Sequence, residues 1–123
     1  MTNEFVLEAI TREFPDSVIS HSEPYDLLTL EIKKDDIKKV IHYLRDSSLE
    51  INFLTDICGI HYPESPAKEI GVIYHLHNMM TNFRIRLKAF MPKENAEVDS
   101  MTDLYAGANW MERETFEFYG VKF

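Results

Sequence analysis

The residues of this sequence with the clearest chemical potential are its histidines and its single cysteine. His75 and His77 are two positions apart in a segment of strand-like alternation, so both imidazoles would lie on one face and could share a transition-metal ion. No spacing marks His61 as a third ligand, and two arginines expected across the hairpin disfavour a bound cation. A solvated polar strand face is therefore the preferred interpretation. A free-standing metal-dependent enzyme that uses His61, His75 and His77 is the alternative.

Cys58 and His61 could form a nucleophile and its general base. No other feature resembles a hydrolase signature, and a free cysteine in an apolar run usually behaves as a small buried hydrophobe. Asp56, in the same run, needs a polar partner if it is buried. The four glycines are scattered, so there is no glycine-rich phosphate loop, and one thiolate cannot hold an iron–sulfur cluster. We expect no catalytic residue, no metal and no cofactor in this chain.

A set of basic residues falls on one face of a predicted hairpin. Residues 70–78 and 83–91 alternate between apolar and polar side chains, and a loop at 79–82 would join them. This register pairs His77 with Arg84 and His75 with Arg86, because a slip of one residue would put charges into the core. The open face would carry a basic patch, which suits an acidic protein partner. The patch consists of His75, His77, Arg84, Arg86 and Lys88.

The last seventeen residues, 107–123, mix large apolar side chains with charges. A helical projection does not separate the two kinds cleanly. Such a mixture is typical of a segment that docks on a partner protein.

The elements that must position these residues follow from hydrophobic periodicity. The clearest helix has Ile37, Val40, Ile41 and Leu44 at positions i, i+3, i+4 and i+7. The other predicted elements before residue 92 are a helix at 3–14, a hairpin of strands at 17–21 and 25–32, a central strand covered on both faces at 51–61, and the strands at 70–78 and 83–91.

The last quarter of the chain is predicted to be a loop followed by short helices. Residues 92–99 are polar and acidic, which indicates an exposed loop. Ser100 to Asp103 has the form of a helix start, Asn109 can cap a helix that begins at Trp110, and Gly120 can end it. The whole order, α-β-β-α-β-β-β plus short C-terminal helices, predicts a single domain over 1–123. Its class is α+β, with two layers and a mixed five-stranded sheet that has helices packed on one face.

Composition limits the classes of function. The chain has 123 residues and a net charge of −8, from 13 Lys and Arg against 21 Asp and Glu, so nucleic acid is not expected as a partner. A lone cysteine is typical of a reducing compartment. No window is long and apolar enough for a membrane span, and the N-terminus lacks the features of a signal peptide.

The C-terminal segment also carries a family likeness. The run Ala108-Asn109-Trp110-Met111-Glu112-Arg113-Glu114, followed by Phe116-Glu117-Phe118-Tyr119-Gly120-Val121, resembles the signature of the 30 kDa (C-type) subunit family of respiratory NADH:quinone oxidoreductase (complex I). Three upstream stretches are also similar to the family. Residues 54–63 resemble its central strand, residues 72–76 with 84–88 resemble its hairpin, and residues 100–105 resemble the segment that leads to the motif. Family members usually continue with a Gly-His-Pro turn, an Arg-rich stretch and an extended tail. This sequence stops at Phe123, so we expect it to lack that tail.

The resemblance implies a two-layer α+β scaffold subunit without catalytic residues or a redox centre. It would lie in the peripheral arm, at the cytoplasmic face of the bacterial inner membrane. It would dock on the quinone-site subunit (D type), which resembles a hydrogenase large subunit, and would support electron transfer from NADH to quinone. FMN, iron–sulfur clusters and quinone would belong to partner subunits.

We expect the segment Trp110–Phe123 and the basic hairpin face to hold the partner subunit. Glu112, Arg113 and Glu114 would make ion pairs or capping contacts, either inside the domain or across the interface. The expected interface residues are His75, His77, Arg84, Arg86, Lys88, Trp110, Glu112, Arg113, Glu114 and Phe118.

Two further alternatives remain beside the metal-dependent enzyme. One is the equivalent small subunit of a membrane-bound hydrogenase or a related dehydrogenase, since the same scaffold recurs there. The other is an acidic binding domain unrelated to respiration.

Overall fold

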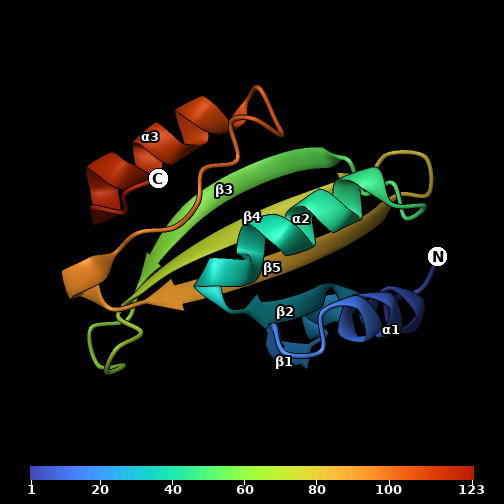
Figure 1. The fold of residues 1–123 in the computed structure, drawn as a ribbon, viewed down its shortest axis with the longest axis horizontal. Coiled ribbons are helices and arrows are strands. Elements are labelled where there is room, and N and C mark those ends of the chain that lie inside the picture. The colour runs from blue at the N-terminus through green and yellow to red at the C-terminus, as the bar shows by residue number, and fades with distance from the viewer.

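Five strands form one mixed sheet in the computed structural model, which describes residues 1–123 (Figure 1). In chain order they are β1 (Val18–Ser22), β2 (Leu28–Ile32), β3 (Phe53–His61), β4 (Ile70–Asn78) and β5 (Phe83–Met91). Across the sheet the order is β1-β2-β5-β4-β3, with β2 and β5 parallel and the other neighbouring pairs antiparallel. The predicted α+β class with a mixed five-stranded sheet is confirmed.

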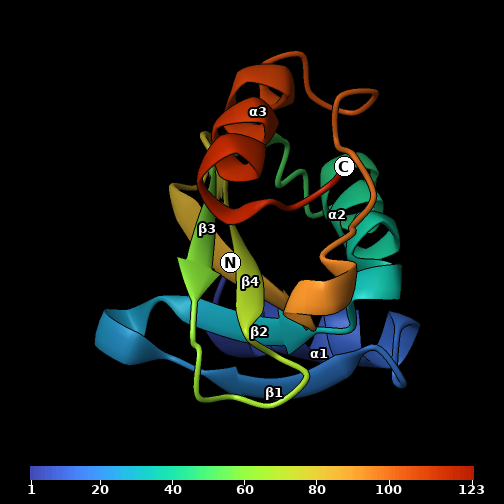
Figure 2. The same cartoon turned by 90° about the vertical axis from the view of Figure 1, so that its left-hand side faces the viewer.

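Helices α1 (Asn3–Glu13) and α2 (Ile37–Asp46) cover one face of this sheet, and α3 (Ala108–Tyr119) lies at its β3 end (Figures 1 and 2). The N-terminus of α1 is capped by Thr2, whose Oγ1 accepts a hydrogen bond from the Phe5 N–H at 3.1 Å. Both helices turn their apolar stripes onto the sheet, and Ile10 of α1 and Leu44 of α2 belong to one continuous core. Burial of these stripes is what fixes the two-layer arrangement.

The hairpin formed by β4 and β5 has the register that the alternation predicts. Tyr74 pairs with Leu87 on the core side, and His75 pairs with Arg86 on the opposite side. The apolar positions of both strands are buried, and the basic positions are exposed or half-buried. The helices therefore leave the basic face of the hairpin uncovered.

The prediction of a central strand at 51–61 is wrong, because β3 is an edge strand that pairs only with β4. A β-bulge explains the misleading pattern. The register shifts between Leu54 and Asp56, so Leu54 and Ile57 both point into the core although they are three residues apart. Apolar residues of both parities thus arise from one covered face and a bulge, not from two covered faces.

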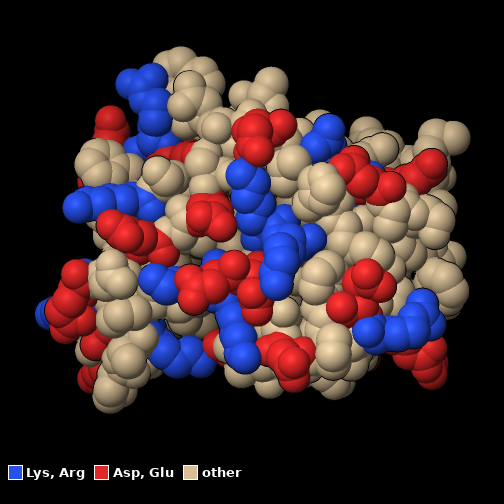
Figure 3. All heavy atoms as spheres, viewed as in Figure 1, with Lys and Arg blue, Asp and Glu red and all other residues tan.

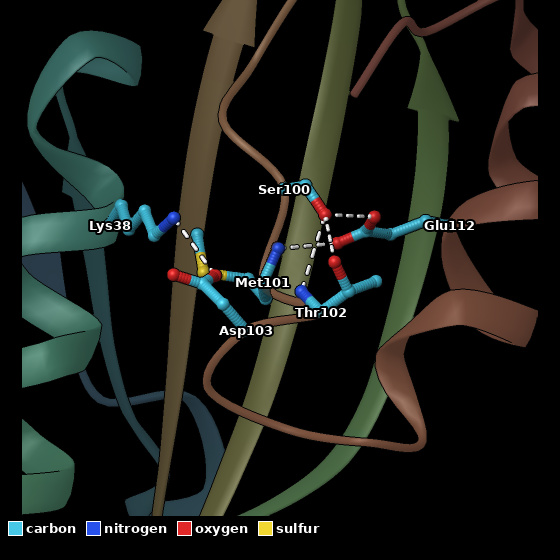
Figure 4. Close-up of polar contacts among 6 residues, drawn as sticks. All are labelled: Lys38, Ser100, Met101, Thr102, Asp103 and Glu112. Atoms are coloured by element: carbon cyan, nitrogen blue, oxygen red, sulfur yellow. Dashed lines mark hydrogen bonds and ion pairs between the residues drawn. The ribbon is translucent and has the colours of Figure 1, made fainter.

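The segment between β5 and α3 also differs from prediction. Residues 96–105, which we call the strap, cross in front of the sheet between α2 and α3 (Figures 1 and 4). Ala96 and Val98 are buried, so the predicted exposed loop is only partly exposed. Ser100 starts no helix, and α3 begins at Ala108, which places Asn109 inside its first turn rather than at its cap. Gly120 ends α3 as predicted, in the left-handed conformation at φ 73°.

Candidate docking surface

Helix α3 buries small and polar side chains and exposes large apolar ones. The buried side chains are Ala108, Glu112 and Thr115. Trp110, Phe116 and Phe118 are 72%, 52% and 76% exposed, and we call the outward surface of α3 that carries these three residues its aromatic face. The large apolar side chains of α3 therefore lie on its outside among the charged ones, which is why a helical projection of this segment does not separate the two kinds.

A glycine allows α3 to pack closely on β3. A Cβ atom placed on Gly59 would lie only 2.3 Å from Cδ2 of Tyr119, so the tyrosine ring rests directly on the strand backbone. Thr115 is also buried on this helix. Its hydroxyl donates a hydrogen bond to the Met111 carbonyl of the preceding turn at 2.9 Å, so the hydroxyl needs no partner on the sheet. Small groups therefore set the distance between the helix and the sheet edge.

A buried carboxylate joins α3 to the strap. Glu112 is 5% exposed and accepts hydrogen bonds from the Ser100 hydroxyl at 2.8 Å and from the Met101 N–H at 2.6 Å (Figure 4). The Met101 side chain is fully buried in the core. Both acceptor oxygens of Glu112 are thus used inside the chain, and its charge is not available on the surface.

The strap is held from the opposite side by α2. Lys38 Nζ lies 2.9 Å from Asp103 Oδ1, and Figure 4 shows this pair and the Glu112 contacts on the two sides of the strap. The hydrogen bond from Lys38 lowers the pKa of the Asp103 carboxyl. The residues after α3 add a third attachment, because the Val98 N–H donates to the Lys122 carbonyl and the Lys122 N–H donates to the Ala96 carbonyl.

The other two charges of the motif remain at the surface. The Arg113 guanidinium lies over the Trp110 ring, 5.0 Å from its centroid, and has no carboxylate within 4.0 Å. Glu114 is likewise exposed and has no ion pair. Of the three charged residues, only Glu112 therefore makes side-chain hydrogen bonds inside the chain.

The basic face of the hairpin is more self-contained than α3. His75 accepts a hydrogen bond at Nε2 from Arg86 Nε at 3.0 Å, and its Nδ1 lies 3.9 Å from Asp56. His77 Nε2 lies 2.9 Å from Asn82 Oδ1. Of the five predicted patch residues only Arg84 is exposed, and the other four are half-buried. Lys88 shares this side of β5 with Arg84 and Arg86. Three of the five predicted patch residues, His75, His77 and Arg86, thus already have hydrogen-bonding partners within the chain.

The histidines proposed as metal ligands are not brought together. His61 pairs with Ile70 at one end of β3 and β4, whereas His77 pairs with Phe53 at the other. A different trio, Asp56, Cys58 and His75, has its ligand atoms within 4.8 Å of one another.

This second trio does not suit a metal ion. The Arg86 bond to Nε2 of His75 leaves the ring proton on Nδ1, the nitrogen that faces Asp56. Burial and the Arg86 charge lower the pKa of His75, and burial with the Asp56 charge raises the pKa of the Cys58 thiol. In this trio the imidazole lone pair at Nε2 is taken up by Arg86 and the thiol is protonated, and the neighbouring arginine charge opposes cation binding.

Acidic and basic side chains are interspersed over the face that carries α2 and the strap, without a field of a single sign (Figure 3). No helix of the chain has the length and apolar character needed to cross a membrane.

The sequence is similar to a described family and to several curated proteins. Residues 30–123 match the family "Respiratory-chain NADH dehydrogenase, 30 Kd subunit". The NADH-quinone oxidoreductase C-type subunit of Azorhizobium caulinodans is 37% identical over 115 residues, which cover 93% of this chain and 54% of that protein. Its counterpart of the same name in Hyphomonas neptunium is 40% identical over 93% of this chain and 56% of that protein. The chain thus spans about half the length of these relatives. It spans 71% of the counterpart in Roseiflexus sp. (strain RS-1), with 36% identity over all of this chain.

Two solved structures share the fold. A trypsin-resistant fragment (1–134) of Nqo5 superposes with a TM-score of 0.85 at 23% identity, covering 100% of this chain and 96% of the fragment. A chain of the membrane-bound sulfane sulfur reductase, an archaeal respiratory membrane complex, gives a TM-score of 0.81 at 22% identity. It covers 98% of this chain and 69% of that one.

Proposed function

This chain belongs to the family of the 30 kDa subunit of respiratory-chain NADH dehydrogenase, and from that premise we propose that it is a non-catalytic scaffold subunit of a proton-translocating NADH:quinone oxidoreductase. In this proposal it lies in the peripheral arm, at the cytoplasmic face of the bacterial inner membrane. It docks on the quinone-site subunit of the D type and supports electron transfer from NADH to quinone by holding that subunit in place.

The observation that carries the proposal is the aromatic face of α3. Three large, mostly exposed side chains project from a helix whose inward side is anchored by Glu112 and Tyr119. Large apolar side chains exposed on a well-anchored helix are typical of a protein–protein interface. The helix lies within the region that matches the family, so we place the contact with the quinone-site subunit there.

The basic face of the hairpin is proposed as a second, polar contact. Arg84 is the residue of that face with the greatest freedom to reach a partner, because His75 and His77 already have hydrogen-bonding partners. We propose that the redox groups, FMN and the iron–sulfur clusters, and the quinone are held by partner subunits.

The test is a tagged pull-down of this chain from solubilised membranes of its own host, with the co-purifying subunits identified by mass. Recovery of the quinone-site subunit together with iron–sulfur subunits of complex I is the expected result. The double variant Trp110→Ser/Phe118→Ser should lose these subunits. The matched control, Phe5→Ser/Tyr25→Ser, removes two exposed aromatic residues outside α3 and should retain them. Loss of the partner in both double variants, or in neither, would contradict docking through α3.

The second candidate function is the equivalent subunit of a related respiratory membrane complex. The fold shared with a chain of the archaeal sulfane sulfur reductase favours this candidate, because the same scaffold occurs there. The same pull-down separates the two candidates. Recovery of hydrogenase-type or sulfur-reductase subunits, without the NADH-oxidising subunits, would support the second.

A further inference from the structure

Two open pockets adjoin the aromatic face of α3, and they meet at Arg113. One, of about 460 Å³, lies between α3, the strap and the C-terminal residues. The other, of about 300 Å³, lies along α3 itself, and the Arg113 side chain lines both. The two pockets differ in the charges that they present.

The first pocket is basic. Arg113 and Lys122 line it together with the rings of Phe116 and Phe123, and neither cation has a carboxylate within 4.0 Å. The one acidic side chain that lines it is Glu112, whose two oxygens already accept hydrogen bonds from the strap. A pocket with two unpaired cations on an acidic chain is therefore complementary to a carboxylate.

The second pocket has the opposite character. Glu114 and Glu117 line it beside Trp110 and Phe118, and neither carboxylate has a cation within 4.0 Å. An ammonium or guanidinium group placed there would meet two carboxylates, which outnumber the one cation, Arg113, that lines the pocket. This pocket is complementary to a lysine or arginine side chain.

We infer that the partner segment that covers α3 carries an acidic side chain for the basic pocket and a basic side chain for the acidic pocket. The inference rests on the proposed function and specifies the chemistry of its partner. Two charges of opposite sign, one on each side of Arg113, allow the partner segment to lie across the helix in one orientation only. Reversed docking would place like charges together in both pockets. The aromatic face then contributes most of the affinity, and the two pockets determine the orientation.

Charge reversal in each pocket tests this arrangement. The substitutions are Lys122→Glu in the basic pocket and Glu117→Lys in the acidic pocket, and both side chains are exposed. The probe is the purified quinone-site subunit of the same host, and its dissociation constant for the full chain is measured at low and at high salt. Each reversal should weaken binding about tenfold or more at low salt, with a smaller effect at high salt.

Two controls separate the pockets from a general effect of net charge. Arg12→Glu and Glu8→Lys change the net charge by the same −2 and +2 on exposed positions of α1. They should leave the dissociation constant within about twofold of the original chain. If net charge alone guided binding, Lys122→Glu and Glu117→Lys would change the affinity in opposite directions, as would the two controls.

Each outcome decides a different point. Weakening by both pocket reversals and by neither control supports the inference. Opposite effects of the two reversals, or no effect of either, overturn it while leaving the proposed function intact. Failure of the unsubstituted chain to bind the quinone-site subunit overturns the proposed function and the inference with it. The neutral variants Lys122→Gln and Glu117→Gln should give intermediate losses, and they replace the reversals if a reversed chain does not fold.

Discussion

Helices α2 and α3 are similar in length and pack on the same sheet, but they use their apolar residues in opposite ways. Helix α2 buries Ile37, Val40, Ile41 and Leu44 completely. Helix α3 buries an alanine, a glutamate and a threonine, and it exposes a tryptophan and two phenylalanines. The apolar residues of α2 therefore stabilise the fold, whereas those of α3 are available to another protein.

The difference shows how a helix with an exposed apolar face can still be held firmly. Helix α3 is attached through a buried carboxylate, a close contact at Gly59 and the strap, so its aromatic side chains are not needed for its own position. A rigid helix with unused apolar surface loses little conformational entropy when it docks. This combination is why we propose α3, and not α2, as the docking element.

The largest expected effect separates the two helices by their contribution to stability. Leu44→Ala in α2 should lower the free energy of unfolding by about 2–5 kcal/mol, because it leaves a cavity in the core. Phe118→Ala in α3 should change it by less than about 0.5 kcal/mol, because the ring is mostly exposed. Urea denaturation followed by circular dichroism measures both. Equal losses of unfolding free energy in the two variants would contradict the difference between α2 and α3.

The next effect concerns the buried carboxylate that anchors α3. Glu112→Ala leaves the Met101 N–H and the Ser100 hydroxyl without their acceptor, and should cost about 1–3 kcal/mol of unfolding free energy. The matched control is Glu114→Ala, two residues away and exposed, which should cost less than about 0.5 kcal/mol. Hydrogen exchange gives a second readout, since protection of the Met101 amide should fall in the first variant only. Similar stabilities for both variants would mean that the strap does not depend on Glu112.

A third variant tests the close approach of α3 to the sheet. In Gly59→Ala the new methyl group would overlap the Tyr119 ring, so the helix must shift, at a cost of about 1–3 kcal/mol. Gly107→Ala is the control, because a methyl group there meets no atom within 4 Å. Tyr119→Ala should rescue part of the stability lost in Gly59→Ala. An additive loss in that double variant would contradict the contact.

The smallest effect concerns the hairpin face and depends on pH. Burial and Arg86 lower the pKa of His75 in the folded chain below its ordinary value of 6.5. As the pH falls below 6.5, the unfolded chain therefore takes up a proton before the folded chain does, and the free energy of unfolding decreases. The decrease continues until the pH passes the folded-state pKa. His75→Gln should flatten this dependence in denaturation curves between pH 7 and 5, and His21→Gln, at an exposed position, should not. An unchanged slope in His75→Gln would show that the Arg86 contact does not control this histidine.

Much of the fold could be predicted from the sequence because local patterns determine it. The spacing of Ile37, Val40, Ile41 and Leu44 identifies α2, and the alternation of the hairpin strands leaves one register. The position of β3 could not be predicted, because a one-residue bulge gives the same sequence pattern as a strand covered on both sides.

The candidate site was predictable in outline but not in its internal contacts. The mixture of apolar and charged residues around Trp110 indicates docking, and Arg113 and Glu114 are at the surface. The contact between Glu112 and the strap spans twelve residues and has no local signature, so sequence reasoning could not decide whether Glu112 lies inside or at the interface. Phe116 and Lys122, which line the basic pocket, lie in the predicted segment Trp110–Phe123. They were not named as interface residues, because only the return of the chain beside the strap brings them together.

The central claim, that α3 is the docking element, can be tested directly because Trp110 is the only tryptophan of the chain. We would replace it with 5-fluorotryptophan and record the fluorine NMR signal with and without the quinone-site subunit. In the free chain the signal should show the solvent isotope shift of an exposed indole. In the complex it should move and lose that isotope shift, because the ring becomes buried. A complex that forms while the signal keeps its position and its isotope shift would show that the partner binds elsewhere.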